Sequence, residues 1–243
     1  MSQLARALSI SRKDIESYYA KPPLVTWGLL FPAVLMLALY VKDPEGYLDV
    51  APGIVAMTLL FGNTSMAAIV ITFEKRSGTL QRLLLAPVTC RTIVLGKAAS
   101  AALYGLVTSL VLTVALVLLM GMPLARPAFF GAGLVLGAMT FSLLGILASS
   151  LVREVFEAMT VMNFFRFPIL FVSGVFAPLG GMPGWVTSIA MASPLTYVVE
   201  LLRFGISGRC YFPSPWLPLA AGVGFVVVSW ASAVVAFRSG ARR

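Results

Sequence analysis

Residues 74–88 read EKRSGTLQRLLLAPV and separate two long apolar runs. Three leucines of this segment lie at helical spacing and form one apolar stripe: Leu80, Leu83 and Leu84. Thr79 can cap a helix here, Gly78 lets the chain turn into it, and Pro87 ends it because the residue before a proline avoids the α region. The segment predicts a two-turn helix over 79–86, which is too short to be stable alone and needs a surface of lipid or protein to pack on.

The composition of the chain places it in a membrane. Of its 243 residues, 59% are hydrophobic and 11% are charged, and the mean hydropathy is +0.95. Soluble proteins carry about 25% charged residues, so a chain this apolar cannot cover a water-facing surface. The net charge of +9 would suggest nucleic acid in a soluble protein. Here the basic residues flank apolar runs instead, and no nucleic-acid partner is expected.

Six apolar runs are long enough to cross a bilayer, which predicts an all-α membrane protein with six transmembrane helices in a single domain over residues 1–243. The predicted spans are 24–41, 50–73, 93–120, 127–152, 158–176 and 216–237. Most of the 18 basic residues fall on one side of the membrane if both termini are cytoplasmic. The positive-inside rule therefore predicts cytoplasmic N- and C-termini, with the segment 74–92 facing the cytoplasm.

Residues 178–210 do not read as a seventh span. They begin with a run rich in glycine and proline, and Pro194 interrupts the apolar stretch that follows. Because a span needs about 20 unbroken apolar residues, two short re-entrant helices at the extracellular edge of the bilayer are expected. Glu200 and Arg203 lie one turn apart there, so we expect a local ion pair, for which a role as an external gate is one hypothesis.

The N-terminal segment 2–20 precedes the first span and predicts an amphipathic interfacial helix at the membrane surface. Its apolar face is expected to consist of residues that recur at helical spacing: Leu4, Leu8, Ser11, Ile15 and Tyr18 or Tyr19. Its charged residues fall largely elsewhere on the helix: Arg6, Arg12, Lys13, Asp14 and Glu16. A frayed basic tail is the alternative.

Some polar side chains fall inside the predicted spans, where a charge is costly and suggests a function. Arg166 lies about 10 Å inside the fifth span at ~1.5 Å per residue, and Asn163 lies one turn before it. Arg166 could line a substrate path, hydrogen-bond across a dimer interface, or extend to the cytoplasmic headgroups. Asn63 could line the same path, although small polar residues in spans more often serve helix packing.

Two blocks of the sequence resemble one family, the ABC-2 type permeases. The first block is 73–88 together with Leu95-Gly96-Lys97, which is similar to the cytoplasmic coupling region of that family. The second block is similar to its fifth span and its extracellular re-entrant helices: 173–178, 182–185 and 193–197. The resemblance extends over roughly residues 5–237.

The resemblance implies a six-span half-transporter of the cell membrane that pairs with a second copy, contacts membrane lipids and binds a separate ATPase subunit. Its coupling helix would insert into a groove of that ATPase and make mechanical contact, with no catalytic residue on this chain. The residues carried over to this role are Glu74, Gly78, Thr79, Leu80, Arg82, Leu83 and Pro87. The family consists mostly of exporters, and this chain is most similar to the drug-exporter branch; a polysaccharide or lipid-linked glycan exporter is the alternative.

Motifs that the sequence lacks narrow the function further. Gly96-Lys97 lacks both the earlier glycine and the following hydroxyl residue of a phosphate-binding loop, so ATP and Mg are expected on the partner ATPase, with no cofactor or metal on this chain. An ion-driven secondary transporter usually carries acidic residues or histidine in its spans, and the predicted span interiors have neither. An intramembrane enzyme would need paired carboxylates or a nucleophile with a base, which are not visible. We therefore expect an ATP-coupled exporter of a hydrophobic or amphipathic small molecule.

Overall fold

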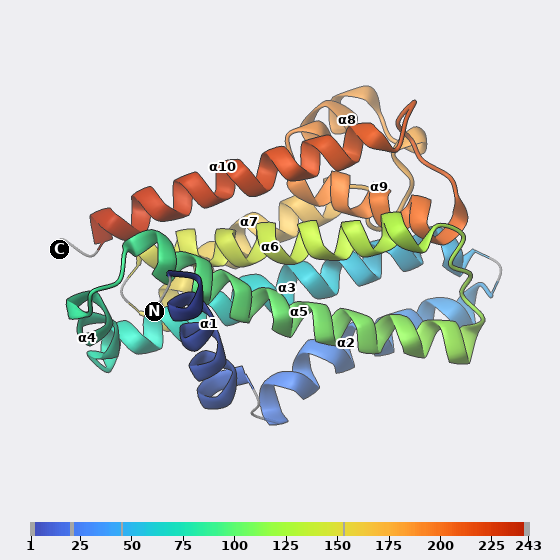
Figure 1. Cartoon of the computed structure of the whole chain (residues 1–243). Coiled ribbons are helices and arrows are strands. Elements are labelled where there is room, and N and C mark those ends of the chain that lie inside the picture. Colours follow the sequence, from blue (N-terminus) through green and yellow to red (C-terminus); the bar gives the residue numbers. More distant parts are fainter. Residues whose placement is uncertain (1–2, 20–21, 45, 153, 241–243) are drawn as a thin grey trace.

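The computed structural model describes residues 3–19, 22–44, 46–152 and 154–240, and helices are the only regular elements among them. In chain order these are α1 Gln3–Asp14, a π-helical turn Ile15–Tyr19, α2 Pro22–Lys42, α3 Tyr47–Arg76, α4 Thr79–Leu85, α5 Cys90–Met120, α6 Pro127–Leu151, α7 Val155–Val172, a 3-10 turn Leu179–Gly181, α8 Gly184–Met191, α9 Pro194–Ser207 and α10 Trp216–Gly240. The long helices lie side by side, with α1 and α4 at one end of the molecule and α8 and α9 toward the other (Figure 1).

Five of the described helices are long and apolar enough to cross a membrane: α3, α5, α6, α7 and α10. The side chains of α2 are described from Leu30 onward, and this part is a shorter apolar helix, Leu30–Lys42. Helices α8 and α9 pass the same test only together, and the bend of 98° between them is that of a broken span or a re-entrant loop. The described residues thus form an all-helical fold with five to six candidate spans.

Several span boundaries differ from the prediction by a few residues, and backbone turns explain two of the differences. Helix α3 continues through 74–76 instead of ending at residue 73, because nothing stops it before Gly78, which reverses the chain with a φ of 72°. Helix α7 ends at Val172 instead of residue 176, since Gly174 adopts a φ of 78°. Left-handed backbone of this kind favours glycine because glycine has no Cβ.

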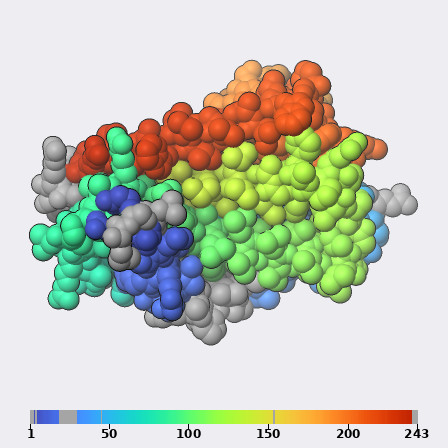
Figure 2. Space-filling view, in the orientation of Figure 1, coloured from blue at the N-terminus to red at the C-terminus, as the bar shows by residue number. Residues whose placement is uncertain are grey.

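Helix α3 lies at the centre of the bundle and packs on α5, α6, α7 and α9. Helix α10 packs mainly on α6, and Figure 2 shows α10, α6 and α5 as adjacent rows along one face of the molecule. Gly105 of α5 leaves the space that the buried Asn63 side chain of α3 fills, because a Cβ at that position would lie 1.5 Å from Asn63 Oδ1. Small residues at such contacts let helices pack tightly where lipid offers no hydrophobic driving force between them.

Local capping explains where α9 begins. Ser193 Oγ accepts a hydrogen bond from Leu195 N at 3.2 Å, and Pro194 takes the first helical position, where its missing N–H costs nothing. Helix α9 is largely buried against α3 and α6, whereas most side chains of α8 are exposed or half-buried. The two short helices expected within 178–210 are therefore present, with the first of them on the outside.

Helix α1 is present, but its buried face differs from the predicted apolar face. Ser11 is buried as predicted, and Ile15 and Tyr18 pack half-buried on the apolar cluster, but Leu8 is 62% exposed, and α1 also buries Ala7, Ile10 and Asp14 against α5. Gly96 of α5 allows this contact, since a Cβ there would lie 2.8 Å from the carbonyl oxygen of Ala7. The prediction was wrong for Leu8 because a close approach of backbones beside the buried Asp14 orients α1 toward α5. The side chains of Leu4 and Tyr19 lie outside the described part of the structure.

Candidate functional site

The segment that separates α3 from α5 forms a compact turn around α4. Gly78 caps the helix with left-handed backbone, and Thr79, which was expected to cap it, is instead its first residue. Leu80 is buried, and Leu83 and Leu84 pack half-buried on the same apolar cluster of α1, α3 and α5 side chains. The predicted leucine stripe thus has its partner surface within the chain itself, which leaves the opposite side of α4 uncovered.

The uncovered side of α4 is the surface that we call the α4 face: Gln81, Arg82 and Leu85, continued by Pro87. Leu85 is 88% exposed, the highest exposed fraction among the large hydrophobic side chains that the structure describes. Of the residues predicted to couple to an ATPase, Arg82 and Pro87 lie on this face, whereas Leu80 lies underneath it. The sequence analysis did not single out Leu85. The sequence does show that Leu85 lies outside the stripe of Leu80, Leu83 and Leu84 and one turn after Gln81, on the other side of the helix.

Glu74 lies apart from the α4 face, inside a buried charge cluster of four residues: Lys13, Asp14, Glu74 and Lys97. Its carboxylate contacts Lys13 Nζ at 2.5 Å and also Lys97 Nζ, which lies 3.2 Å from Asp14 Oδ2. The side chains of Asp14 and Glu74 are fully buried and that of Lys97 is 2% exposed. In this conformation Glu74 is therefore not placed to touch another chain, and it joins α1, α3 and α5 instead.

Burial and the neighbouring charges shift the pKa values of Asp14 and Lys13 within the charge cluster. Burial raises the pKa of the Asp14 carboxyl above its usual range, and Glu74 also raises it, against the lowering effect of Lys97 and Lys13. The pKa of Lys13, which burial alone would lower, is raised because its ammonium pairs with Glu74 and Asp14. The sequence analysis placed Asp14 on the polar face of an amphipathic helix and did not pair it with Lys97.

Further contacts fasten the α4 segment to its surroundings. Arg6 of α1 donates a hydrogen bond to the carbonyl oxygen of Pro87, and Thr92 Oγ1 donates to Gln3 Oε1 at 2.9 Å. Lys75 Nζ, at the end of α3, donates to the carbonyl oxygen of Ser149 at 2.5 Å and so reaches the end of α6. These bonds join α1, the ends of α3 and α6, and the start of α5 into one packed unit beside α4, which we call the α4 platform.

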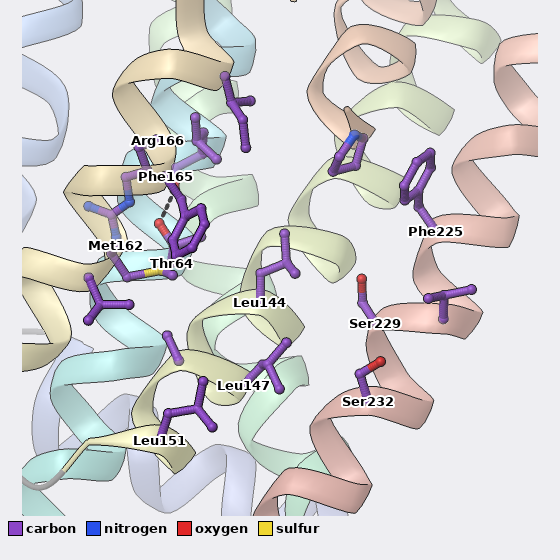
Figure 3. Close-up of a pocket in the computed structure, with 16 residues that line it drawn as sticks. Thr64, Leu144, Leu147, Leu151, Met162, Phe165, Arg166, Phe225, Ser229 and Ser232 are labelled. Carbon is purple, nitrogen blue, oxygen red and sulfur yellow. Dashed lines mark hydrogen bonds between the residues drawn. The ribbon is translucent and has the colours of Figure 1, made fainter. Parts of the chain in front are cut away.

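A cavity of about 440 Å³ lies between α7 and α10, over α6 (Figure 3). Most of its described lining is aliphatic or aromatic, and Arg166 lines the side formed by α3 and α7. The Arg166 side chain is 3% exposed, lies 5.2 Å from the centre of the Phe61 ring, and donates from Nη1 to Asn163 Oδ1 at 3.3 Å. Arg166 is eleven residues, or about 16 Å, beyond the start of α7 and turns into the bundle, which contradicts the alternative that it extends to the headgroups.

Asn63 does not line this cavity among the residues described. It is fully buried, donates from Nδ2 to the carbonyl oxygen of Ala138 at 3.0 Å, and packs against Gly105 of α5. Its position therefore fits the helix-packing alternative, and the next residue, Thr64, is the one that lines the cavity. Asn163 is exposed on α7 and reaches the cavity only through its hydrogen bond to Arg166.

The ion pair expected between Glu200 and Arg203 is confirmed, with 3.4 Å between Arg203 Nε and Glu200 Oε1. Both side chains are buried. Arg203 Nη2 also donates to the carbonyl oxygen of Gly174 at 2.8 Å, and Glu200 Oε2 accepts from Tyr211 N at 2.8 Å. The pair thus fastens α9 to the turn after α7 and to the loop before α10, so a gate at this place would have to break these bonds.

The described residues form helices only, and five of these helices are long and apolar enough to cross a bilayer, as in a multi-pass membrane protein. Residues 6–206 match the model of the ABC-2 type transporter family, and because this is more than half of the chain, the protein belongs to that family. This match confirms the resemblance to the ABC-2 type permeases seen in the sequence.

Named relatives agree with this family. The chain is 32% identical over 204 residues to ycf38 of Cyanophora paradoxa, named as a transport permease, and covers 66% of its length. It is 24% identical over 191 residues to the inner membrane transport permease YadH of Escherichia coli strain K12, of which it covers 75%. It is also 24% identical over 155 residues to YbhR of the same strain, named as a probable multidrug ABC transporter permease. The matches to ycf38, YadH and YbhR span 79%, 77% and 63% of this chain, respectively. The chain covers 42% of the length of YbhR.

Proposed function

We propose that this chain is the transmembrane subunit of an ATP-driven exporter, which works as a dimer with a second copy and is moved by a separate ATPase subunit. ATP and Mg would bind to that ATPase and not to this chain. The basic residues that flank the spans support cytoplasmic N- and C-termini, with the α4 face on the cytoplasmic side.

The observation that carries this proposal is the α4 face. A helix of seven residues would not be stable alone in water, yet α4 is held by its own leucine stripe and presents Arg82 and the bare Leu85 outward. An exposed leucine beside an arginine, at the rim of a rigid unit, is typical of a contact that a partner protein completes. We infer that the ATPase subunit covers Leu85 and pairs with Arg82.

The α4 platform supplies the route by which such a contact would act on the spans. Helix α4 follows α3 after a turn of two residues, and the segment after it is bonded to α1 through Arg6 and Pro87. Lys75 fastens the end of α3 to the end of α6. A displacement of α4 would therefore move the ends of α3, α5 and α6 together, because packed interiors transmit strain and do not absorb it.

The cargo that fits this chain best is a hydrophobic or amphipathic small molecule. The apolar cavity between α7 and α10 supports this choice, since small-molecule sites are mostly apolar with few polar groups. The name of YbhR, a probable multidrug ABC transporter permease, points the same way.

The test is to co-express the chain with the ATPase encoded nearest to it, purify the pair in lipid nanodiscs and measure ATP turnover. Leu85→Asp is expected to abolish co-purification or permease-dependent turnover without unfolding the permease. Leu8→Asp, at an exposed leucine of α1, is the matched control and is expected to leave both unchanged. Normal complex formation and turnover in Leu85→Asp would refute the assignment of the α4 face.

A further inference from the structure

The cavity between α7 and α10 has one charged group and otherwise little polarity. Its sixteen described lining residues include no acidic side chain. Besides Arg166, the polar lining side chains are Thr64, whose hydroxyl already donates to the carbonyl oxygen of Leu60, and the hydroxyls of Ser229 and Ser232. A ligand for this space must therefore be mostly apolar and must carry no positive charge near Arg166.

Arg166 has donors that no described group satisfies. Its Nη1 reaches Asn163, but its Nε and Nη2 are buried and have no hydrogen-bond partner among the residues described. The ring of Phe61 supports the guanidinium from one side without accepting these bonds. A buried cation with unmet donors is costly, and an anionic oxygen is the group that best satisfies it.

The cavity opens to the apolar outside of the bundle. Several residues that line it are also strongly exposed: Leu151 (71%), Phe165 (55%) and Val228 (63%). Helix α7 packs mainly on α3 and α10 mainly on α6, and the exposure of these lining residues shows that the space between α7 and α10 opens to the side. In a bilayer a ligand would enter here from the hydrocarbon region, which selects molecules that dissolve in lipid.

We propose that this cavity binds a single-chain amphiphile with one anionic group, such as a long-chain carboxylate. The anionic group pairs with Arg166, and the chain lies over α6 between α7 and α10. A volume of about 440 Å³ falls in the range of small-molecule sites, roughly 300–1,000 Å³. That such a molecule is the exported cargo rests on the proposed function, whereas its binding to the cavity does not.

The test measures binding to the purified chain in nanodiscs of zwitterionic lipid, without ATPase or ATP. The probes are radiolabelled palmitate and hexadecanol, which share a chain length and differ in charge. Palmitate is expected to bind more tightly than hexadecanol. Arg166→Gln is expected to weaken the binding of palmitate by about tenfold or more and to leave the affinity for hexadecanol unchanged. Arg238→Gln, at an exposed arginine of α10, is the matched control and is expected to change neither.

A second variant tests the apolar part of the site. Ser232→Phe fills the cavity and is expected to weaken both probes, whereas Ser239→Phe, at an exposed position of the same helix, is expected to weaken neither. Equal affinity for the two probes, or unchanged palmitate binding in Arg166→Gln, would overturn the proposal.

A third arm separates a free amphiphile from a membrane lipid. Competition by phosphatidylglycerol added to the nanodiscs would assign the site to a two-chain lipid and overturn the single-chain ligand. A result that overturns this binding proposal says nothing about complex formation or ATP turnover through the α4 face. Failure of the binding proposal can therefore be distinguished from failure of the proposed function.

Discussion

Replacing Lys97 with methionine would remove the cation that lies between two buried carboxylates. In the native chain Lys97 Nζ contacts both Asp14 and Glu74, and all three side chains are almost completely buried. Lys13 also contacts both carboxylates, but its side chain is 43% exposed. The variant would therefore leave two buried negative charges with one partly solvated cation as their counter-ion.

The expected loss of stability in Lys97→Met is the usual cost of breaking a buried ion pair, about 3–5 kcal/mol. At about 2–4 °C per kcal/mol for a domain of this size, the melting midpoint is expected to fall by roughly 6–20 °C. The loss should be smaller at low pH, because the Asp14 carboxyl, whose pKa burial already raises, can take up a proton and stop repelling Glu74.

The assay is the thermal unfolding midpoint of the purified chain in nanodiscs, followed by tryptophan fluorescence. The control is the double variant Lys97→Met with Asp14→Asn, which removes one charge of each sign and leaves Lys13 paired with Glu74. We expect it to recover at least half of the loss. A single variant that melts within 2 °C of the native chain, on the scale of about 1 kcal/mol or less, would refute the idea that the cluster holds α1 to the bundle.

Three other changes test separate parts of the fold, each through the same unfolding midpoint. Burial raises the folded-state pKa of Asp14, so the folded chain keeps a proton that the unfolded chain has released, and the Asp14 contribution to stability falls as pH rises from about 4 through that raised pKa. Asp14→Asn should flatten this pH dependence, and an unchanged slope in the variant would show that Asp14 does not cause it. Gly105→Ala drives a Cβ into the Asn63 side chain, which is held by its bond to the carbonyl oxygen of Ala138, and should cost about 1–3 kcal/mol; a neutral result would mean that Asn63 can turn aside without loss. Glu200→Gln leaves Arg203 buried without its counter-ion and should cost about 3–5 kcal/mol; no loss would mean that the pair is solvated in the membrane.

Much of the fold could be predicted because its signals are local. Long apolar runs located the spans, and Pro194 with the preceding serine located the bend between α8 and α9. The turn into α4 followed from Gly78, and its end from Pro87. The ion pair of Glu200 with Arg203 was predictable for the same reason, since its two members lie one turn apart on one helix.

The candidate sites were less predictable because their members are distant in sequence. Nothing local pairs Asp14 with Lys97 or buries Glu74, so the position of Glu74 was missed. The leucine stripe of α4 was correctly read as a face that needs a partner, but only packing revealed that the partner is the chain itself, which left Leu85 exposed.

The sequence by itself determined that this protein is a bundle of apolar helices in a membrane, where most helices end, and to which family it belongs. The tertiary structure alone decided which face of each helix is buried, that Arg166 turns into the bundle, and that a cavity lies between α7 and α10. The physical reason is that lipid is as apolar as a protein core. In a soluble helix the polar face marks the solvent, but here both faces are apolar, so only the packing of the helices against each other distinguishes them.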